Sequence, residues 1–345
     1  MSEAAGPEAA LSEADLPTAW RWSTPIRLIR LEGADARRFL HGQSSQAIEL
    51  APPGSCVATC LISPTARMRA LALACIDEGG IDLLVVAGDG GQVHQQIDRV
   101  LFPADRVRLG RPQPATLVRW LGATPEALEA SGTTRLLHPG VDLGAGRDQP
   151  ALLLVGEEAP GVSSQADIHG YPAQENRPPL PAWLQPLPEL TPEQRERRRL
   201  RQGFPAAPGE LNDDTNPFEL GLANWVSLSK GCYVGQETLA KLATYDGVKQ
   251  QLRHWRAPRT GPAAADACAP GTPLITTAGG RAGVITSMLS SPDGLEGLAL
   301  VRRAALEDHQ LLAGESTAGA VRLEIQIPNG FSAPPVGAGG GGKPS

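Results

Sequence analysis

The chain has 345 residues, of which 41% are hydrophobic, 20% are charged and only 4% are aromatic. This length is too great for one ordinary core and suits two or three domains, whose interiors must be filled mainly by aliphatic side chains. The formal net charge of −6 at pH 7 argues against strong non-specific binding to nucleic acid or to an anionic membrane. No stretch is apolar for long enough to span a membrane, and the acidic residues 1–17 match neither a signal peptide nor a transit peptide. We therefore expect a cytoplasmic protein.

The first part of the chain alternates strand patterns with amphipathic helix patterns. The stretch IRLIRLEG alternates apolar and polar residues, as a half-buried strand does. Gly42 is expected to end the first helix. Strands followed by amphipathic helices favour an α+β fold with the helices on one face of a sheet. In chain order we expect strands at 26–33, 57–62, 68–76 and 81–88 and helices at 35–42 and 91–102.

The middle of the chain contains a basic segment that predicts a helix. Thr191 is a good N-cap, Pro192 suits the first helical position and Gly203 suits the C-terminal cap. Most arginines at 195–201 lie where cations favour the helix dipole. The simplest interpretation is a solvated helical face, and the sharper alternative is a patch that faces RNA or phosphate. The other segments expected here are short elements at 116–122, 125–131 and 151–156 and an extended proline-rich linker at 172–188.

Toward its C-terminus the sequence changes to short strands between glycine-rich turns, a pattern typical of a small β-barrel. We therefore expect an α+β region at 18–250, made of two modules with a boundary near 110–115, and a barrel domain at 251–330. The two ends, 1–17 and 331–345, are rich in small residues and are expected to be disordered.

The five cysteines are an odd number in a large chain and do not form a disulfide framework. Cys56, Cys60 and Cys75 lie in apolar runs and are expected to be buried strand residues without chemistry. Cys268 lies in a loop-like stretch. The spacings predict no zinc set and no intrinsic metal site. The six histidines are scattered, and His41 is expected at the surface of its helix.

The remaining cysteine, Cys232, stands in the motif KGCYVGQE at 230–237. Two glycines flank it in a turn just before an expected helix, and they allow the dihedral angles of a tight loop. A helix N-terminus and the nearby Lys230 both favour a thiolate, the nucleophilic and metal-binding form. The Gln–Glu pair that ends the motif suits either a helix cap or a ligand contact. A turn whose cysteine only packs is the simpler alternative.

The motif KGCYVGQE resembles the signature of the YgfZ family, folate-binding-type proteins that are related to the glycine-cleavage T-protein. The resemblance extends over most of residues 24–330. It is supported by the stretches LEGADARRFLHGQSSQAIEL, QGFPAAPGELNDDTNPFELGL and GRAGVITS. It marks Cys232 as the functional thiol. The other positions that match the motif are Lys230, Gly231, Tyr233, Gly235, Gln236 and Glu237.

Similarity to this family implies an α+β, T-protein-like fold with ferredoxin-like modules and a C-terminal β-barrel. It also implies a role in iron–sulfur cluster assembly or repair, including the clusters of enzymes that modify tRNA. Tetrahydrofolate or a folate derivative is the cofactor that the resemblance implies, and iron–sulfur client proteins or carriers are the partners. A single cysteine cannot hold a cluster, so Cys232 would be a ligand shared with a partner, with glutathione or with another carrier.

The sequence departs from the T-protein pattern at two places. Arg69 and Ala70 stand near the expected pair of aspartates, and an arginine cannot take up a proton as a carboxylate does. Arg201 stands where T-proteins carry a glutamate that accepts hydrogen bonds from the pterin, and it offers only donors. Arg201 and Glu219 are the candidate ligand-binding residues, although a capping box with Asn216 explains Glu219 more simply.

Three functions therefore stay open on the sequence. The first is a cluster-assembly factor with little or no catalysis of its own, and the second is a folate-dependent aminomethyltransferase or demethylase-like enzyme. The third is an RNA-binding adaptor, in which the basic helix contacts tRNA directly. Because one fold serves many activities, the fold alone does not decide among them.

Overall fold

The computed structural model describes residues 17–125, 133–156, 178–258, 262–292, 294–314 and 319–335. The segments expected to be disordered, 1–17 and 331–345, lie mostly outside them, as do the element expected at 125–131 and the first part of the linker at 172–188.

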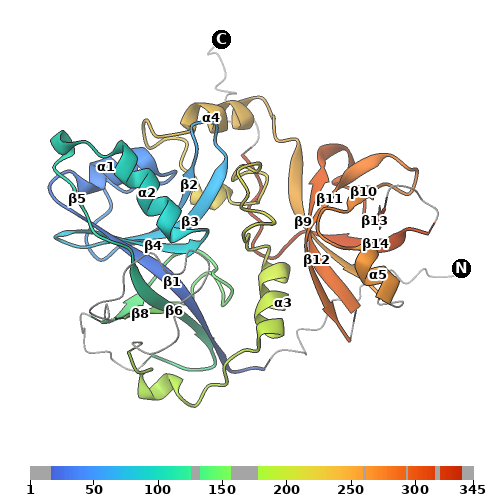
Figure 1. The fold of residues 1–345 in the computed structure, drawn as a ribbon, viewed down its shortest axis with the longest axis horizontal. Helices are drawn as coiled ribbons and strands as arrows, with labels where there is room; N and C mark the ends of the chain where they lie inside the picture. The colour runs from blue at the N-terminus through green and yellow to red at the C-terminus, as the bar shows by residue number, and fades with distance from the viewer. Residues whose placement is uncertain are drawn as a thin grey trace, which may run out of the picture.

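An eight-stranded antiparallel sheet forms one lobe of the molecule (Figure 1). Its order is β2-β3-β4-β1-β6-β8-β7, and the short β5 also pairs with β1. The long central strand β1 pairs with β4 through its second half and with β6 through its first, so it joins the earlier and later parts of the region in one sheet. The strands are β1 (Trp20–Glu32), β2 (Cys56–Ile62), β3 (Met68–Ile76), β4 (Gly80–Ala87), β5 (Arg108–Leu109), β6 (Gln113–Leu121), β7 (Thr134–Leu137) and β8 (Ala151–Val155).

Two helices, α1 (Ala36–Gln43) and α2 (Gly90–Val100), cover one face of this sheet (Figure 1). Leu40 of α1 and Val93 of α2 are buried in one apolar cluster with residues of the sheet, as the amphipathic patterns predict. Helix α1 does not end at Gly42, as the sequence predicted, but continues to Gln43. The hydroxyl of Ser44 donates to the carbonyl of Leu40 at 2.8 Å, so a serine satisfies one of the helix's last carbonyls.

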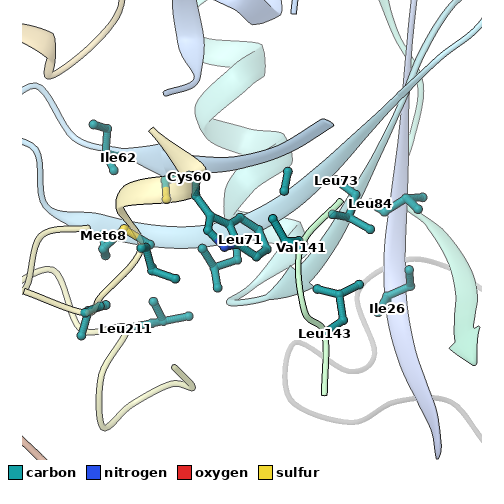
Figure 2. Close-up of a cluster of buried hydrophobic side chains, with 14 of the residues drawn as sticks. Ile26, Cys60, Ile62, Met68, Leu71, Leu73, Leu84, Val141, Leu143 and Leu211 are labelled. Atoms are coloured by element: carbon teal, nitrogen blue, oxygen red, sulfur yellow. The ribbon is translucent and has the colours of Figure 1, made fainter. Parts of the chain in front are cut away.

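Strand β3 shows how one sequence serves both faces of the sheet. In MRALALACI the alanines, such as Ala72, pack in the cluster beneath the helices, whereas Leu71 and Leu73 pack in the cluster on the opposite face. Figure 2 shows this second cluster, in which Leu71, Met68 and Leu211 lie together. The small alanines of β3 thus face the helices, and its larger leucines face the irregular segments on the opposite side of the sheet.

A closed six-stranded barrel forms the other lobe, with order β10-β11-β12-β9-β14-β13 (Figure 1). This is the β-barrel that the sequence predicted, and the buried Cys268 belongs to its core. The barrel elements are β9 (Gln250–Ala257), α5 (Pro262–Ala267), β10 (Pro273–Ile275), β11 (Arg281–Ser291), β12 (Gly294–Arg302), β13 (Gln310–Ala313) and β14 (Val321–Gln326). Single-turn 3-10 helices occur at Pro103–Asp105, Ala182–Leu184, Ala223–Trp225 and Arg303–Ala305.

Helix α3 (Pro192–Gln202) lies between the two lobes (Figure 1). It begins and ends as predicted, with Thr191 in a capping box and Gly203 in the left-handed region at φ 72°. Its arginines do not form the solvated face that the sequence predicted. Arg197 lies 3.0 Å from a carboxylate oxygen of Glu296 in the barrel, and its side chain is only 9% exposed. The basic helix therefore packs against the barrel through its arginines.

Within the described ranges, no helix is long and apolar enough to cross a membrane.

Candidate functional site

The KGCYVGQE loop turns Cys232 outward and Tyr233 inward. Cys232 is exposed, whereas Tyr233 is 8% exposed and belongs to the large core cluster. Gly235 has φ 81° and caps helix α4 (Gln236–Thr244). A Cβ at Gly235 would lie 2.7 Å from Cδ1 of Ile62 and 2.8 Å from the carbonyl oxygen of Ser63, so this position requires glycine. The loop therefore rests directly on the end of β2.

Lys230 ties the loop to the segment that follows α1. Its ammonium donates to the carbonyl oxygens of His41, of Ser44 at 2.7 Å and of Gln46 at 2.8 Å. It also lies 4.6 Å from the ring centre of Tyr233, a cation–π contact. Burial lowers the pKa of Lys230 to about 7, whereas the three carbonyl acceptors favour the charged form. The sequence suggested that Lys230 supplies charge to the thiol, but these contacts give it a structural task.

His41 is the second residue that fixes the loop. Its Nδ1 lies 3.3 Å from the backbone nitrogen of Ile48 and 3.2 Å from that of Glu49. Because a backbone N–H can only donate, Nδ1 accepts and the ring proton sits on Nε2. Nε2 then donates to the carbonyl of Lys230 at 3.0 Å. We expected His41 at the surface of its helix; it is partly buried, and its ring fixes the loop to the segment after α1.

The end of the motif forms the first turn of α4. The amide of Gln236 donates to the carbonyl of Tyr233 at 3.2 Å, which closes the turn. Glu237 is exposed and pairs with Lys241 at 2.7 Å, one helical turn further on. The hydrogen bond from Lys241 lowers the pKa of Glu237. Gly235 has no side chain that could cap α4, and Glu237 lies in the first turn, where an acidic side chain favours the helix dipole.

Arg201 belongs to a buried ionic cluster in a different part of the molecule. Its Nε lies 3.4 Å from Oε2 of Glu296, and Nε2 of His254 lies 3.3 Å from the same oxygen. Arg197 contacts the other oxygen of Glu296 at 3.0 Å. Burial alone would raise the pKa of Glu296, but these partners outweigh it and lower the pKa. The cluster joins α3 to β12, and the Arg201 guanidinium already contacts a carboxylate.

Glu219 has the structural role that its spacing predicted. Its carboxylate accepts from the amide of Asn216 at 3.0 Å, and the Asn216 side chain accepts from the amide of Glu219 at 3.1 Å. Glu219 is 7% exposed, and burial raises the pKa of its carboxyl. The segment forms a turn rather than a regular helix. The capping pair was predicted correctly, and the ligand-binding role of Glu219 stays a prediction.

Arg69 stands at the start of β3, where the T-protein resemblance placed an acid. Its Nε lies 3.4 Å from a carboxylate oxygen of Asp213, an exposed loop residue. Arg67 donates to the backbone carbonyl of Asp214 in the same loop. The side chain at the expected acid position is thus a cation, and the acid that faces it comes from another segment. The arrangement offers no paired carboxylates at this strand.

The chain resembles known proteins in sequence and in fold. No family model matches the chain. The chain is 30% identical over 305 residues to the "Putative transferase At1g60990, chloroplastic" of Arabidopsis thaliana, a match that covers 85% of this chain and 67% of the relative. This chain belongs to the family of that transferase. The relative is named as chloroplastic, and our expectation of a cytoplasmic location for this chain stays a prediction.

A search of solved structures gives the fold. The glycine cleavage system aminomethyltransferase T from Bartonella henselae superposes with a TM-score of 0.61 at 16% sequence identity, over 92% of this chain and 87% of that one. The predicted T-protein-like fold is therefore confirmed. Neither match names the YgfZ type, iron–sulfur clusters or tRNA modification, so these stay predictions.

The sequence resemblance led us to expect a folate, and the surroundings of Arg201 bear on that expectation. A pterin presents N–H donors, and at this position the chain offers the donor-only Arg201, which is bound to Glu296. The residues at this place do not fit a pterin held as in the T-proteins. For metals, the part of the chain that the structure describes holds no group of three or more His, Cys, Asp or Glu side chains placed around one point. Cys232 offers a single ligand.

Proposed function

We propose that this protein presents the thiol of Cys232 to iron–sulfur client proteins or carriers and so assists the assembly or repair of their clusters, including clusters of enzymes that modify tRNA. The observation that carries the proposal is the contrast within the loop. Cys232 is exposed, although Lys230, Tyr233 and Gly235 around it are fixed by carbonyls, by the core and by close packing. The resemblance of the loop to the YgfZ signature supplies the client class.

Such a loop offers one exposed sulfur atom, which can act as a nucleophile or as a metal ligand. A thiolate attacks disulfide or persulfide sulfur and ligates iron, but a cluster needs several ligands. The other ligands must come from the partner, so the complex would be transient and would form across an interface. A loop that is already ordered loses little conformational entropy when it binds. This agrees with a rigid loop that leaves only its sulfur free.

The second candidate is a folate-dependent aminomethyltransferase or demethylase-like enzyme, and the comparisons favour this kind of activity. The fold is that of an aminomethyltransferase, and the relative carries the name of a transferase. Arg69 and Arg201 count against it, because neither supplies the carboxylate that the reaction and the pterin require. The test is turnover of an aminomethyl or N-methyl donor by the purified protein with tetrahydrofolate. Steady turnover that Cys232→Ala retains would replace our proposal with this one.

The proposal is tested by rescue of a bacterium that lacks its own family member. The strain receives the intact protein, Cys232→Ala or Cys268→Ala, and tRNA methylthiolation is measured under oxidative stress. Cys268 is a matched control because it is a free cysteine buried in the barrel core. We expect rescue by the intact protein and by Cys268→Ala, and loss of rescue by Cys232→Ala at equal expression. Full rescue by Cys232→Ala would contradict the role of the thiol.

A further inference from the structure

Two other cysteines, Cys56 and Cys75, face each other across the sheet. They are direct partners in the antiparallel pairing of β2 with β3. Their sulfur atoms lie 2.8 Å apart, although they are not bonded. Both side chains belong to the cluster on the sheet face that Figure 2 shows, opposite to the helices. The sequence predicted buried strand cysteines without chemistry, and this contact suggests otherwise.

The backbone at this pair suits a disulfide. The amide of Ile76 donates to the carbonyl of Ser55 at 2.8 Å, one step away from the cysteine pair. In an antiparallel ladder, the pair next to a hydrogen-bonded pair is the narrow one, with Cα atoms about 4.5 Å apart. Disulfides span Cα separations of about 4.4–6.8 Å. The two sulfurs therefore need no shift of either strand to form a bond.

The surroundings decide which sulfur reacts first. Cys75 is 3% exposed, whereas Cys56, near the start of β2, is partly exposed. The hydrogen bond with Cys56 and burial raise the pKa of Cys75 well above its ordinary value, so Cys75 holds its proton. A small oxidant therefore meets Cys56 first, and Cys75 is the neighbour placed to resolve it.

We propose that Cys56 and Cys75 form a redox modification site, at which a peroxide converts the two thiols into an intramolecular disulfide. The sulfur of Cys56 attacks the peroxide, the O–O bond breaks, and a sulfenic acid and one water result. The sulfur of Cys75 then attacks that sulfur, the S–O bond breaks, and a second water leaves with the Cys75 proton. The two thiols lose two electrons and the peroxide gains them. An added dithiol reverses the step and becomes a disulfide itself.

The bond would join β2 to β3 at the end of these strands that lies opposite to the thiol loop. Strand β2 ends at Ile62, against which Gly235 packs, and β3 pairs with β2 along its length. A disulfide between the two strands restricts the unfolded chain and so stabilises this part of the sheet. The inference does not depend on the proposed function, because it concerns a different pair of sulfurs.

The experiment treats the full-length protein with hydrogen peroxide and then with arsenite, which returns a sulfenic acid to the thiol but leaves a disulfide intact. The protein is then alkylated under denaturing conditions and its mass is measured. Of the five cysteines, we expect three to be alkylated after oxidation and all five after treatment with dithiothreitol. Trypsin cleaves at Arg67 and Arg69, so Cys56 and Cys75 fall in separate peptides that only a disulfide joins. Five alkylated cysteines after oxidation, or a bond that involves Cys232, would overturn the proposal.

Two variants make the assignment specific. Cys56→Ala should retain its four remaining thiols under conditions that oxidise the intact protein. Cys60→Ala should still lose two thiols, because Cys60 shares the strand and its face with Cys56 but lies opposite Leu71. The reverse pattern would assign the bond to Cys60 and overturn the proposal. Near-ultraviolet circular dichroism of both reduced variants checks that the core is intact.

Discussion

The thiol loop and the Glu296 cluster are both built from polar residues, yet only one of them leaves a reactive group free. In the cluster, Arg197, Arg201 and His254 all converge on one buried carboxylate. In the loop, the polar contacts hold the backbone while the sulfur of Cys232 stays exposed. The difference shows that the position which the T-protein resemblance assigned to a ligand joins α3 to the barrel here.

The largest effect should come from breaking the cluster. Glu296→Gln leaves two arginines and a histidine buried beside α3 without their carboxylate. Removing one partner from a buried ion pair costs about 3–5 kcal/mol of unfolding free energy. The measurement is urea unfolding at pH 7. Glu324→Gln is the matched control, because Glu324 lines a surface pocket together with Arg197 and Glu296 but is exposed. This variant should change the unfolding free energy by less than about 0.5 kcal/mol. Equal losses in both variants would contradict the account.

Gly235→Ala should cause the next largest loss of unfolding free energy, because it disturbs the packing of the loop on the end of β2. An L-residue in the left-handed region costs about 1–2 kcal/mol, and the added methyl would also contact Ile62 and the backbone of Ser63. Gly231→Ala is the comparison: its φ is 104°, but no atom lies within 4 Å of the added carbon. Chemical denaturation should show a clearly larger loss of unfolding free energy for Gly235→Ala than for Gly231→Ala. A larger loss for Gly231→Ala would show that the loop does not pack on β2.

Lys230→Met should change the pH dependence of stability. The folded-state pKa of about 7 lies below the ordinary 10.5, so the unfolded chain binds more protons between these values. The contribution of Lys230 to the unfolding free energy therefore rises as pH increases from about 7 toward 10.5. Lys230→Met lacks this rise, and its stability relative to the intact protein should fall across that range. A difference that is independent of pH would show that the three carbonyls keep the ammonium charged.

Cys232→Ala should have the smallest effect on stability. The side chain is exposed, and replacing such a residue usually changes the unfolding free energy by less than about 0.5 kcal/mol. Thermal and urea unfolding of the variant should match those of the intact protein. A loss of more than about 1 kcal/mol would show that Cys232 is a packing residue, as the simpler sequence interpretation held.

Local patterns predicted much of the fold. The alternation in MRALALACI, the capping residues Thr191 and Gly203 and the glycine-rich C-terminal strands all correspond to observed elements. These features depend on residues close together in the chain, where propensity and periodicity act directly. The barrel and the T-protein-like architecture followed from the family resemblance together with these patterns.

Long-range contacts could not be predicted in the same way. Lys230 and His41 are 189 residues apart, and no local rule pairs a loop carbonyl with an imidazole at that distance. The facing of Cys56 and Cys75 depends on the strand register, and a slip of one residue would turn one sulfur to the other face. The arginine pattern of α3 predicted a helix but not Glu296, a partner that the barrel supplies.

The most direct measurement follows the recovery of a peroxide-damaged [4Fe–4S] enzyme in the presence of the purified protein. Ferrous iron, sulfide and a thiol reductant are held constant, and the intact protein is compared with Cys232→Ala and with Cys268→Ala. We predict that the intact protein and Cys268→Ala accelerate recovery equally and that Cys232→Ala gives only the rate of the reaction without protein. Equal acceleration by Cys232→Ala would contradict the claim that the exposed thiol of the loop is required for recovery of the cluster.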